Sequence, residues 1–142
     1  MVKAVDANNP EYASQDGVLF NKTITQLIQY PAGKTSTAYS IPDSVVKIGA
    51  SAFYGCDNLK DIHIPKSLEY IGSDVFSWGD LENVYIKDVA AYLNIGYADG
   101  EYGLPMYYAD NLYLNGELVT ELIIPDSVTS IGDYAFYYCT SL

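Results

Sequence analysis

Short runs in which apolar and polar residues alternate recur along this chain, and each run predicts a short β-strand. The runs are LKDIHI (Leu59–Ile64), LENVYI (Leu81–Ile86) and VTELII (Val119–Ile124). Because successive side chains of a strand point to opposite faces, the apolar members face a core and the polar members face solvent. A proline follows each run except the second, where Lys87 stands. Proline ends a strand because it has no N–H to donate to a ladder.

The segments that follow such strands repeat as well. IPDSVVKIGASAFYGC (Ile41–Cys56) and IPDSVTSIGDYAFYYC (Ile124–Cys139) are nearly identical, and IPKSLEYIGSDVFSWG (Ile64–Gly79) is a third version. In each copy the Ile-Gly pair predicts a tight bend that needs a permissive backbone. The Ala-Phe or Val-Phe pair that follows predicts a short helical turn whose phenylalanine fills the core. A single copy cannot bury its own apolar face, so the copies must stack into a solenoid.

The shared pattern, I-P-x-S-V-x-x-I-G-x-x-A-F-x-x-C-x-x-L-x-x-I-x-I, resembles the BspA-like leucine-rich-repeat family, also called the Treponema pallidum type. It covers residues 41–86 and 119–142. The resemblance implies a right-handed leucine-rich-repeat solenoid, built mainly of short β-strands with short helical turns. It also implies a bacterial surface or secreted protein with a role in adhesion, and it supplies no shared catalytic residues. We therefore expect that the chain is not an enzyme.

The repeats divide the chain into four segments. Residues 1–40 form an N-terminal tail and a variant coil with a β-hairpin, and residues 41–86 form two leucine-rich repeats. Residues 87–118 form an insertion, and residues 119–142 form a third, truncated repeat. Because that repeat stops before its last strand, we expect the chain to be a piece of a longer protein.

The insertion departs from the repeat in three ways. Asp88 predicts the cap of a short helix over Val89–Asn94. A loop rich in tyrosine and glycine follows, and Asn115-Gly116 then predicts a hairpin with a type I′ turn. On this interpretation the second strand of the hairpin re-enters the solenoid. The insertion is either a structural spacer or a projecting loop that carries function.

Composition narrows the class of partner. The chain has 142 residues, 49% of them hydrophobic, and its 18 acidic and 7 basic residues give a net charge of −11. Such a charge repels phosphate, so we exclude nucleic acid as a partner. The N-terminus lacks the apolar core of a signal peptide, and no run approaches the ~20 apolar residues that span a bilayer. We expect an extracellular or cell-surface location, no membrane insertion by this segment, and a signal or anchor outside it.

The residues that could carry chemistry are few. His63 is the single histidine, and no second histidine or nearby cysteine completes a metal set with it, so we expect neither metal nor cofactor. It is either a contact on a binding face or simply an exposed strand residue. Cys56 and Cys139 occupy the same repeat position, in coils that stack ~5 Å apart. With at least two coil steps between them they lie beyond the ~7 Å that a disulfide allows, which predicts two free, buried thiols.

The outward strand positions predict ladders of side chains across the coils. The ladders are Lys60, Glu82 and Thr120; Asp61, Asn83 and Glu121; and His63, Tyr85 and Ile123. We expect tyrosines of the insertion to lie beside these ladders. An extended sheet face flanked by aromatic residues suits a protein or glycan partner. The candidate binding residues are Asp61, His63, Asn83, Tyr85, Tyr97, Tyr102, Tyr107, Tyr108 and Glu121. The alternative is that the ladders are only solvated sheet.

The interpretation of the whole chain is a non-catalytic extracellular module for binding or adhesion. Its partner is a protein or carbohydrate on a host or neighbouring cell. Two alternatives remain open, namely a passive stalk that only spaces other domains, and an accessory domain of a larger secreted enzyme. The flanking sequence of the full gene product would separate these three roles.

Overall fold

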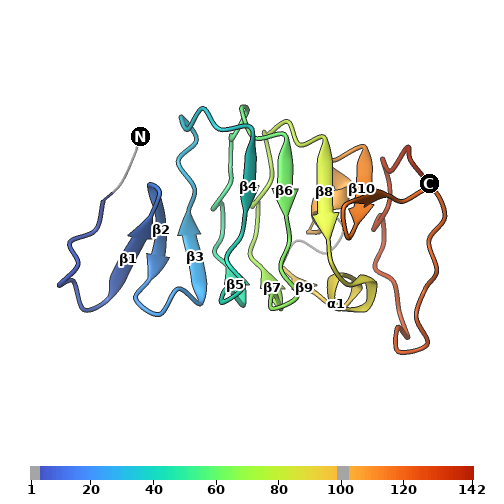
Figure 1. Cartoon of the computed structure of the whole chain (residues 1–142), viewed down its shortest axis with the longest axis horizontal. Coiled ribbons are helices and arrows are strands. Elements are labelled where there is room, and N and C mark those ends of the chain that lie inside the picture. Colours follow the sequence, from blue (N-terminus) through green and yellow to red (C-terminus); the bar gives the residue numbers. More distant parts are fainter. Residues whose placement is uncertain (1–3, 99–102) are drawn as a thin grey trace.

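The computed structural model describes residues 4–98 and 103–142. Two sheets face each other along the length of the molecule (Figure 1). Sheet A has the order β1 (Tyr12–Gln15), β2 (Val18–Asn21), β3 (Gln26–Gln29), β5 (Lys47–Ile48), β7 (Tyr70–Ile71) and β9 (Gly96–Tyr97). Sheet B has the order β11 (Glu117–Leu118), β10 (Asn111–Leu114), β8 (Asn83–Ile86), β6 (Asp61–His63) and β4 (Ala38–Ser40).

The chain forms a solenoid because consecutive strands from β4 to β10 alternate between the two sheets. Each strand then lies parallel to the equivalent strand of the next coil. In sheet B the register aligns Tyr39, Ile62, Val84 and Leu112, whose side chains point inward. The last three of these are almost completely buried. The leucine-rich-repeat solenoid of short strands with little helix, expected from the sequence, is confirmed.

Aromatic rings fill the space between the sheets. Phe53 and Phe76, at the same position of successive coils, stack with their ring centroids 5.4 Å apart, and Tyr30 continues the stack 5.1 Å from Phe53. All three are buried. Phe136, the equivalent residue of the last copy, is only partly buried against this core. The expected role of the repeat phenylalanine is therefore met fully in the first two copies.

The segments after each Ile-Gly pair form turns rather than helices, and the bend is not made by the glycine. The left-handed residues stand two positions later, at Ser51 (φ 58°), Asp74 (φ 52°) and Tyr134 (φ 57°). Gly72 is needed for a different reason, since a Cβ there would lie 2.7 Å from the backbone nitrogen of Ala50 in the preceding coil. The sequence interpretation of this glycine as a bend residue is wrong; it permits close approach of two backbones.

The helix and the hairpin of residues 87–118 form where the sequence predicts them. Helix α1 (Val89–Leu93) begins at Asp88, whose side chain accepts a 2.8 Å hydrogen bond from the Ala91 N–H. A 3₁₀ turn, η1 (Pro105–Tyr107), precedes β10. The hairpin turns at Asn115-Gly116, with φ values of 51° and 86°, as a type I′ turn requires.

The way in which this hairpin joins the solenoid differs from the prediction. Its first strand, β10, pairs in parallel with β8, whereas its second strand, β11, pairs antiparallel with β10 at the edge of sheet B. The interpretation that the second strand re-enters the solenoid is therefore wrong. The sequence ADNLYL (Ala109–Leu114) is itself a copy of LENVYI, with alanine in place of the first leucine.

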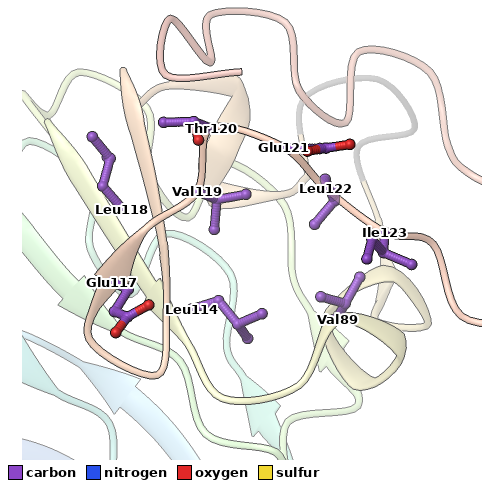
Figure 2. Close-up of a pocket in the computed structure, with 9 residues that line it drawn as sticks. All are labelled: Val89, Leu114, Glu117, Leu118, Val119, Thr120, Glu121, Leu122 and Ile123. Carbon is purple, nitrogen blue, oxygen red and sulfur yellow. The ribbon is translucent and has the colours of Figure 1, made fainter.

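Residues 119–142, all of them described, contain no strand, so the strand predicted over Val119–Ile124 is absent. This segment crosses the C-terminal end of the solenoid (Figure 1) and is attached to the last coil by the Thr140 N–H, which donates to the Asp110 carbonyl oxygen at 2.8 Å. Ile123, expected on a strand, is 82% exposed. A hollow of about 270 Å³, which we call the C-terminal hollow, separates residues 117–123 from Val89 and Leu114 (Figure 2).

The N-terminal segment contains the hairpin that the sequence predicts between β2 and β3. It also contains an additional strand, β1, which pairs with β2 across Asp16-Gly17. Both turn residues have positive φ, of 49° and 79°. The Asp-Gly pair is the local signal that predicts such a turn.

Candidate functional site

The outer face of sheet B carries a row of stacked rings, which we call the aromatic ladder and which consists of His63, Tyr85 and Tyr113. The parallel register places His63 opposite Tyr85 and Tyr85 opposite Tyr113. The ring centroids of His63 and Tyr85 are 4.3 Å apart with an angle of 10° between the planes, and those of Tyr85 and Tyr113 are 4.5 Å apart at 16°. The sequence prediction placed Ile123 in the third position, and the structure places Tyr113 there because β10 is the next strand of the sheet.

A second row, the amide ladder, runs beside the first and consists of Asp61, Asn83 and Asn111. The Asn83 Nδ2 donates to Asp61 Oδ1 at 2.7 Å, and the Asn111 Nδ2 donates to Asn83 Oδ1 at 2.9 Å. These bonds hold each side chain in one orientation and leave one Asp61 oxygen and the Asn111 carbonyl oxygen at the two ends. Glu121, predicted as the third member, lies instead at the margin of the C-terminal hollow (Figure 2).

The third predicted ladder also changes at its last member. Lys60 and Glu82 are neighbours, because the Glu82 N–H donates to the Lys60 carbonyl oxygen at 2.8 Å. The next residue in the row is Asp110, whose N–H donates to the Glu82 carbonyl oxygen at 2.9 Å, rather than Thr120. Lys60 itself forms an ion pair with Asp80. Its charge is therefore partly neutralised beside the outer face of sheet B.

A groove runs along the C-terminal ends of β4, β6 and β8, next to the aromatic ladder. It consists of two hollows, one of about 250 Å³ on the side of β4 and one of about 350 Å³ on the side of β10. His63, Ile64 and Lys87 line both hollows, so the two adjoin each other. The Lys87 Nζ lies 4.0 Å from Asp43 Oδ1 across the first hollow. The groove therefore combines an apolar floor, ring edges and one pair of opposite charges.

The ionisation state of Tyr85 favours hydrogen bonding by a neutral phenol. Burial against its neighbours, and then the negative charge of Asp61, raises the pKa of Tyr85. At neutral pH the Tyr85 hydroxyl is therefore a proton donor as well as an acceptor. Because the ring faces cover one another, the outward surface of the ladder consists of ring edges and polar tips.

The other candidate tyrosines of residues 87–118 that the structure describes lie away from the aromatic ladder. Tyr97 is in sheet A, and a Cβ at Gly103 or Gly132 would overlap its side chain. Tyr107, the last residue of η1, stacks on Tyr137, which follows Phe136 in the last copy, with ring centroids 5.6 Å apart. Tyr108 lies 6.4 Å from Phe76, centroid to centroid. Tyr102 lies outside the described residues.

The structure thus brings together Asp61, His63, Asn83 and Tyr85 from the candidate list. It separates these four from Glu121 and from the list's other described tyrosines, Tyr97, Tyr107 and Tyr108. It adds Asn111 and Tyr113, which the sequence analysis missed. The signal for both is the match between ADNLYL (Ala109–Leu114) and the earlier strand sequences. Alanine at its first position and the hairpin turn after it concealed the match.

Both cysteines are free and buried, which confirms the prediction of two free thiols. Burial, and then the charge of Asp57, raises the pKa of the Cys56 thiol to about 11. Within the described residues, no group of three or more His, Cys, Asp or Glu side chains is arranged to hold a metal ion. In the same part of the chain, no helix is long and apolar enough to cross a membrane.

Comparison with known proteins gives a family and two similar structures. The chain is 28% identical to the pneumococcal vaccine antigen PcpA over 78% of this chain and 32% of that one, with a TM-score of 0.54. A leucine-rich repeat protein from Eubacterium ventriosum is 21% identical over 94% of this chain and 51% of that one, with a TM-score of 0.40. Comparison with curated protein sequences gives no significant match.

This chain therefore spans about a third and about a half of the lengths of the two solved chains. The family whose pattern matches is described as the BspA type leucine rich repeat region, in six copies over residues 30–97 and 108–142. These residues make up more than half of the chain and include β4 to β9, β10, β11 and the C-terminal segment. The chain belongs to the BspA type leucine-rich-repeat family.

Proposed function

We propose that this chain is a non-catalytic binding module of an extracellular or surface-attached bacterial protein, and that the outer face of sheet B is its binding surface. The observation that carries the proposal is the aromatic ladder of His63, Tyr85 and Tyr113 beside the amide ladder. The partner is a protein or carbohydrate on a host or neighbouring cell, which makes the role of the module adhesion.

Preorganisation supports this assignment. A flexible surface side chain loses about 0.5–1.5 kcal/mol of rotamer freedom when a partner immobilises it. The rings of the aromatic ladder are already held by their neighbours, and the amide ladder is already hydrogen-bonded. A partner that docks on this face therefore loses little binding free energy to ordering, which is the usual advantage of tyrosine in binding surfaces.

Charge limits the class of partner. The chain carries a net charge of −11, which opposes anionic polymers and favours neutral or basic ones. The polar tips of the ladders include one carboxylate, two amides, two phenols and one imidazole, a set that suits the hydroxyls of a sugar or the backbone of a protein. A surface location agrees with the likeness to a pneumococcal vaccine antigen.

The experiment is a binding screen with purified chain against immobilised neutral glycans and extracellular matrix proteins. The variants are Tyr85→Ala and His63→Ala. The matched control is Tyr54→Ala, which removes an exposed tyrosine from the turn between β5 and β6. The proposal predicts saturable binding that falls at least about tenfold, or ~1.4 kcal/mol, in the two ladder variants and is unchanged in the control. A passive spacer predicts no binding by any of the four proteins, and an equal loss in the control would contradict the assignment of the site.

A further inference from the structure

The aromatic ladder ends abruptly at β4. The register places Ser40 opposite His63, in the position that the next ring of the ladder would occupy. Tyr85 covers one face of the His63 imidazole at 4.3 Å, and the other face is directed towards the short side chain of Ser40. Both His63 and Ser40 are exposed. One face of the imidazole is therefore open at the end of the stack.

A hollow of the right size lies at this open end. It has a volume of about 250 Å³ and is lined by Ser40, Pro42, Asp43, His63, Pro65 and Lys87, among others. This is slightly below the ~300–1,000 Å³ typical of sites for drug-sized ligands, so it suits a single ring. A ring placed here would continue the spacing of 4.3 and 4.5 Å that the ladder already has.

We propose, on the basis of the proposed function, that this hollow is a subsite for one neutral pyranose residue of a glycan, stacked on the open face of His63. A pyranose has an apolar face of C–H groups that packs on a ring, and hydroxyls around its rim that need hydrogen-bonding partners. The hollow offers both surfaces. The imidazole and Pro42 provide apolar contact, while the Asp43 carboxylate provides an acceptor and the Lys87 ammonium provides donors.

The pair of opposite charges favours a sugar over an aromatic side chain of a protein. Asp43 and Lys87 are exposed and lie 4.0 Å apart, so water solvates both in the free protein. A ligand that displaces this water without hydrogen-bonding groups leaves the charges poorly solvated, which costs free energy. Vicinal hydroxyls replace the lost water contacts. The net charge of −11 disfavours acidic sugars at the same position.

The shared lining of the two hollows indicates how a longer glycan would lie. The second hollow, of about 350 Å³, begins at His63, Ile64 and Lys87 and extends past Tyr85 to Asn115 and Gly116. An oligosaccharide seated over Ser40 therefore continues across the coils, along the lower edge of the aromatic ladder. The sugar residue over Ser40 stacks on the ring face of His63, and the following sugar residues contact the ring edges and polar tips of the ladder.

The test uses His63 as its own reporter, because it is the single histidine of the chain. The imidazole C–H signals are followed by NMR at one fixed pH while methyl β-D-glucopyranoside, methyl β-D-galactopyranoside or methyl α-D-mannopyranoside is added to concentrations on the order of tens of millimolar. N-acetylneuraminic acid serves as the acidic sugar, and N-acetyl-L-tryptophanamide represents an aromatic side chain. The variant Ser40→Tyr adds the missing ring and fills the subsite, and Ser40→Ala is its matched control.

We expect at least one neutral glycoside to shift the His63 signals saturably in the parent chain and in Ser40→Ala. In Ser40→Tyr the affinity falls at least tenfold. A shift caused only by N-acetyl-L-tryptophanamide, no saturable shift with any neutral glycoside, or an unchanged affinity in Ser40→Tyr would each overturn the subsite. If Ser40→Tyr retains binding in the screen while Tyr85→Ala loses it, the subsite is wrong and the proposed binding face stands. If the parent chain binds nothing in the screen, the proposed function fails.

Discussion

The imidazole of His63 and the phenol ring of Tyr85 lie face to face, 4.3 Å apart between centroids and 10° from parallel, although they belong to different coils. The backbone register is the cause, because parallel strands are ~4.8 Å apart and in-register side chains on one face repeat at that distance. The pairing of β6 with β8 therefore builds the fold and the surface at once. A change in this surface is expected to be measurable as a change in stability as well as in binding.

The first prediction concerns Tyr85, whose ring is stacked on both sides. Replacing it in Tyr85→Ala removes two aromatic contacts of a half-exposed residue, each worth about 0.5–1.5 kcal/mol. We expect the free energy of unfolding, measured with urea, to fall by about 1–2 kcal/mol. The control Tyr54→Ala removes an exposed tyrosine and is expected to change it by less than about 0.5 kcal/mol. Equal effects of the two changes would contradict the stacking energy assigned to the ladder.

The second prediction concerns the hydroxyl of Tyr30. Among the described residues this is the buried side-chain oxygen that has no hydrogen-bond partner, and burial raises the pKa of Tyr30 to about 12. An unsatisfied buried polar group is destabilising, so Tyr30→Phe is expected to raise the free energy of unfolding by about 1 kcal/mol. Tyr12→Phe, at an exposed ring, should have no effect. A loss of stability in Tyr30→Phe would show that the hydroxyl has a partner, such as water.

The third prediction separates two roles of glycine in the coil. At Gly72 a Cβ would lie 2.7 Å from the Ala50 backbone nitrogen, so Gly72→Ala must push two coils apart. We expect a loss of about 1–3 kcal/mol in the free energy of unfolding. In the matched variant Gly79→Ala the added Cβ lies 3.4 Å from its nearest neighbour, an ordinary contact, and little change is expected. Tolerance of alanine at Gly72 would contradict the close approach of these backbones.

The fourth prediction concerns pH and the buried thiols. The pKa of Cys56 rises from its ordinary value of 9.0 to about 11 because of burial, so the folded state holds this proton more tightly than the unfolded chain does. Its contribution to stability is complete below pH 9 and is lost as the pH rises towards 11. Alkaline unfolding should therefore be less steep in Cys56→Ala than in the parent chain. At pH 8 a thiol reagent should react slowly with the folded protein, because both cysteines are buried. After denaturation it should react with both cysteines.

Much of the solenoid can be predicted from the sequence because the repeated apolar positions are the ones that are buried in each coil. The strands at Asp61–His63 and Asn83–Ile86 and the buried Phe53, Phe76 and Cys56 all occupy repeated positions of one apolar pattern. Helix α1 follows from a local signal, the Asp88 cap. In each case the residue type and its spacing are sufficient, because the physical requirement is local or is repeated in every coil.

The errors arose where two signals compete for one segment. Asn111–Leu114 is both the first strand of a hairpin and a copy of the repeat strand, and only the parallel pairing with β8 shows that it continues sheet B. The similarity of Val119–Cys139 to the earlier copies predicted a strand that the segment does not form. The left-handed residues Ser51, Asp74 and Tyr134 share a position but not a residue type, so no sequence signal marks them.

The most direct test of the proposed binding face is an NMR map of the bound state. Backbone amide signals of the chain are followed while the tightest-binding glycan or protein of the screen is added. The account predicts that the perturbed amides and side-chain amides cluster on β6, β8 and β10, with Asn83 and Asn111 among them. Perturbations centred instead on Tyr107 and Tyr137, on sheet A or on the C-terminal hollow would contradict it, since those surfaces lie outside the two ladders.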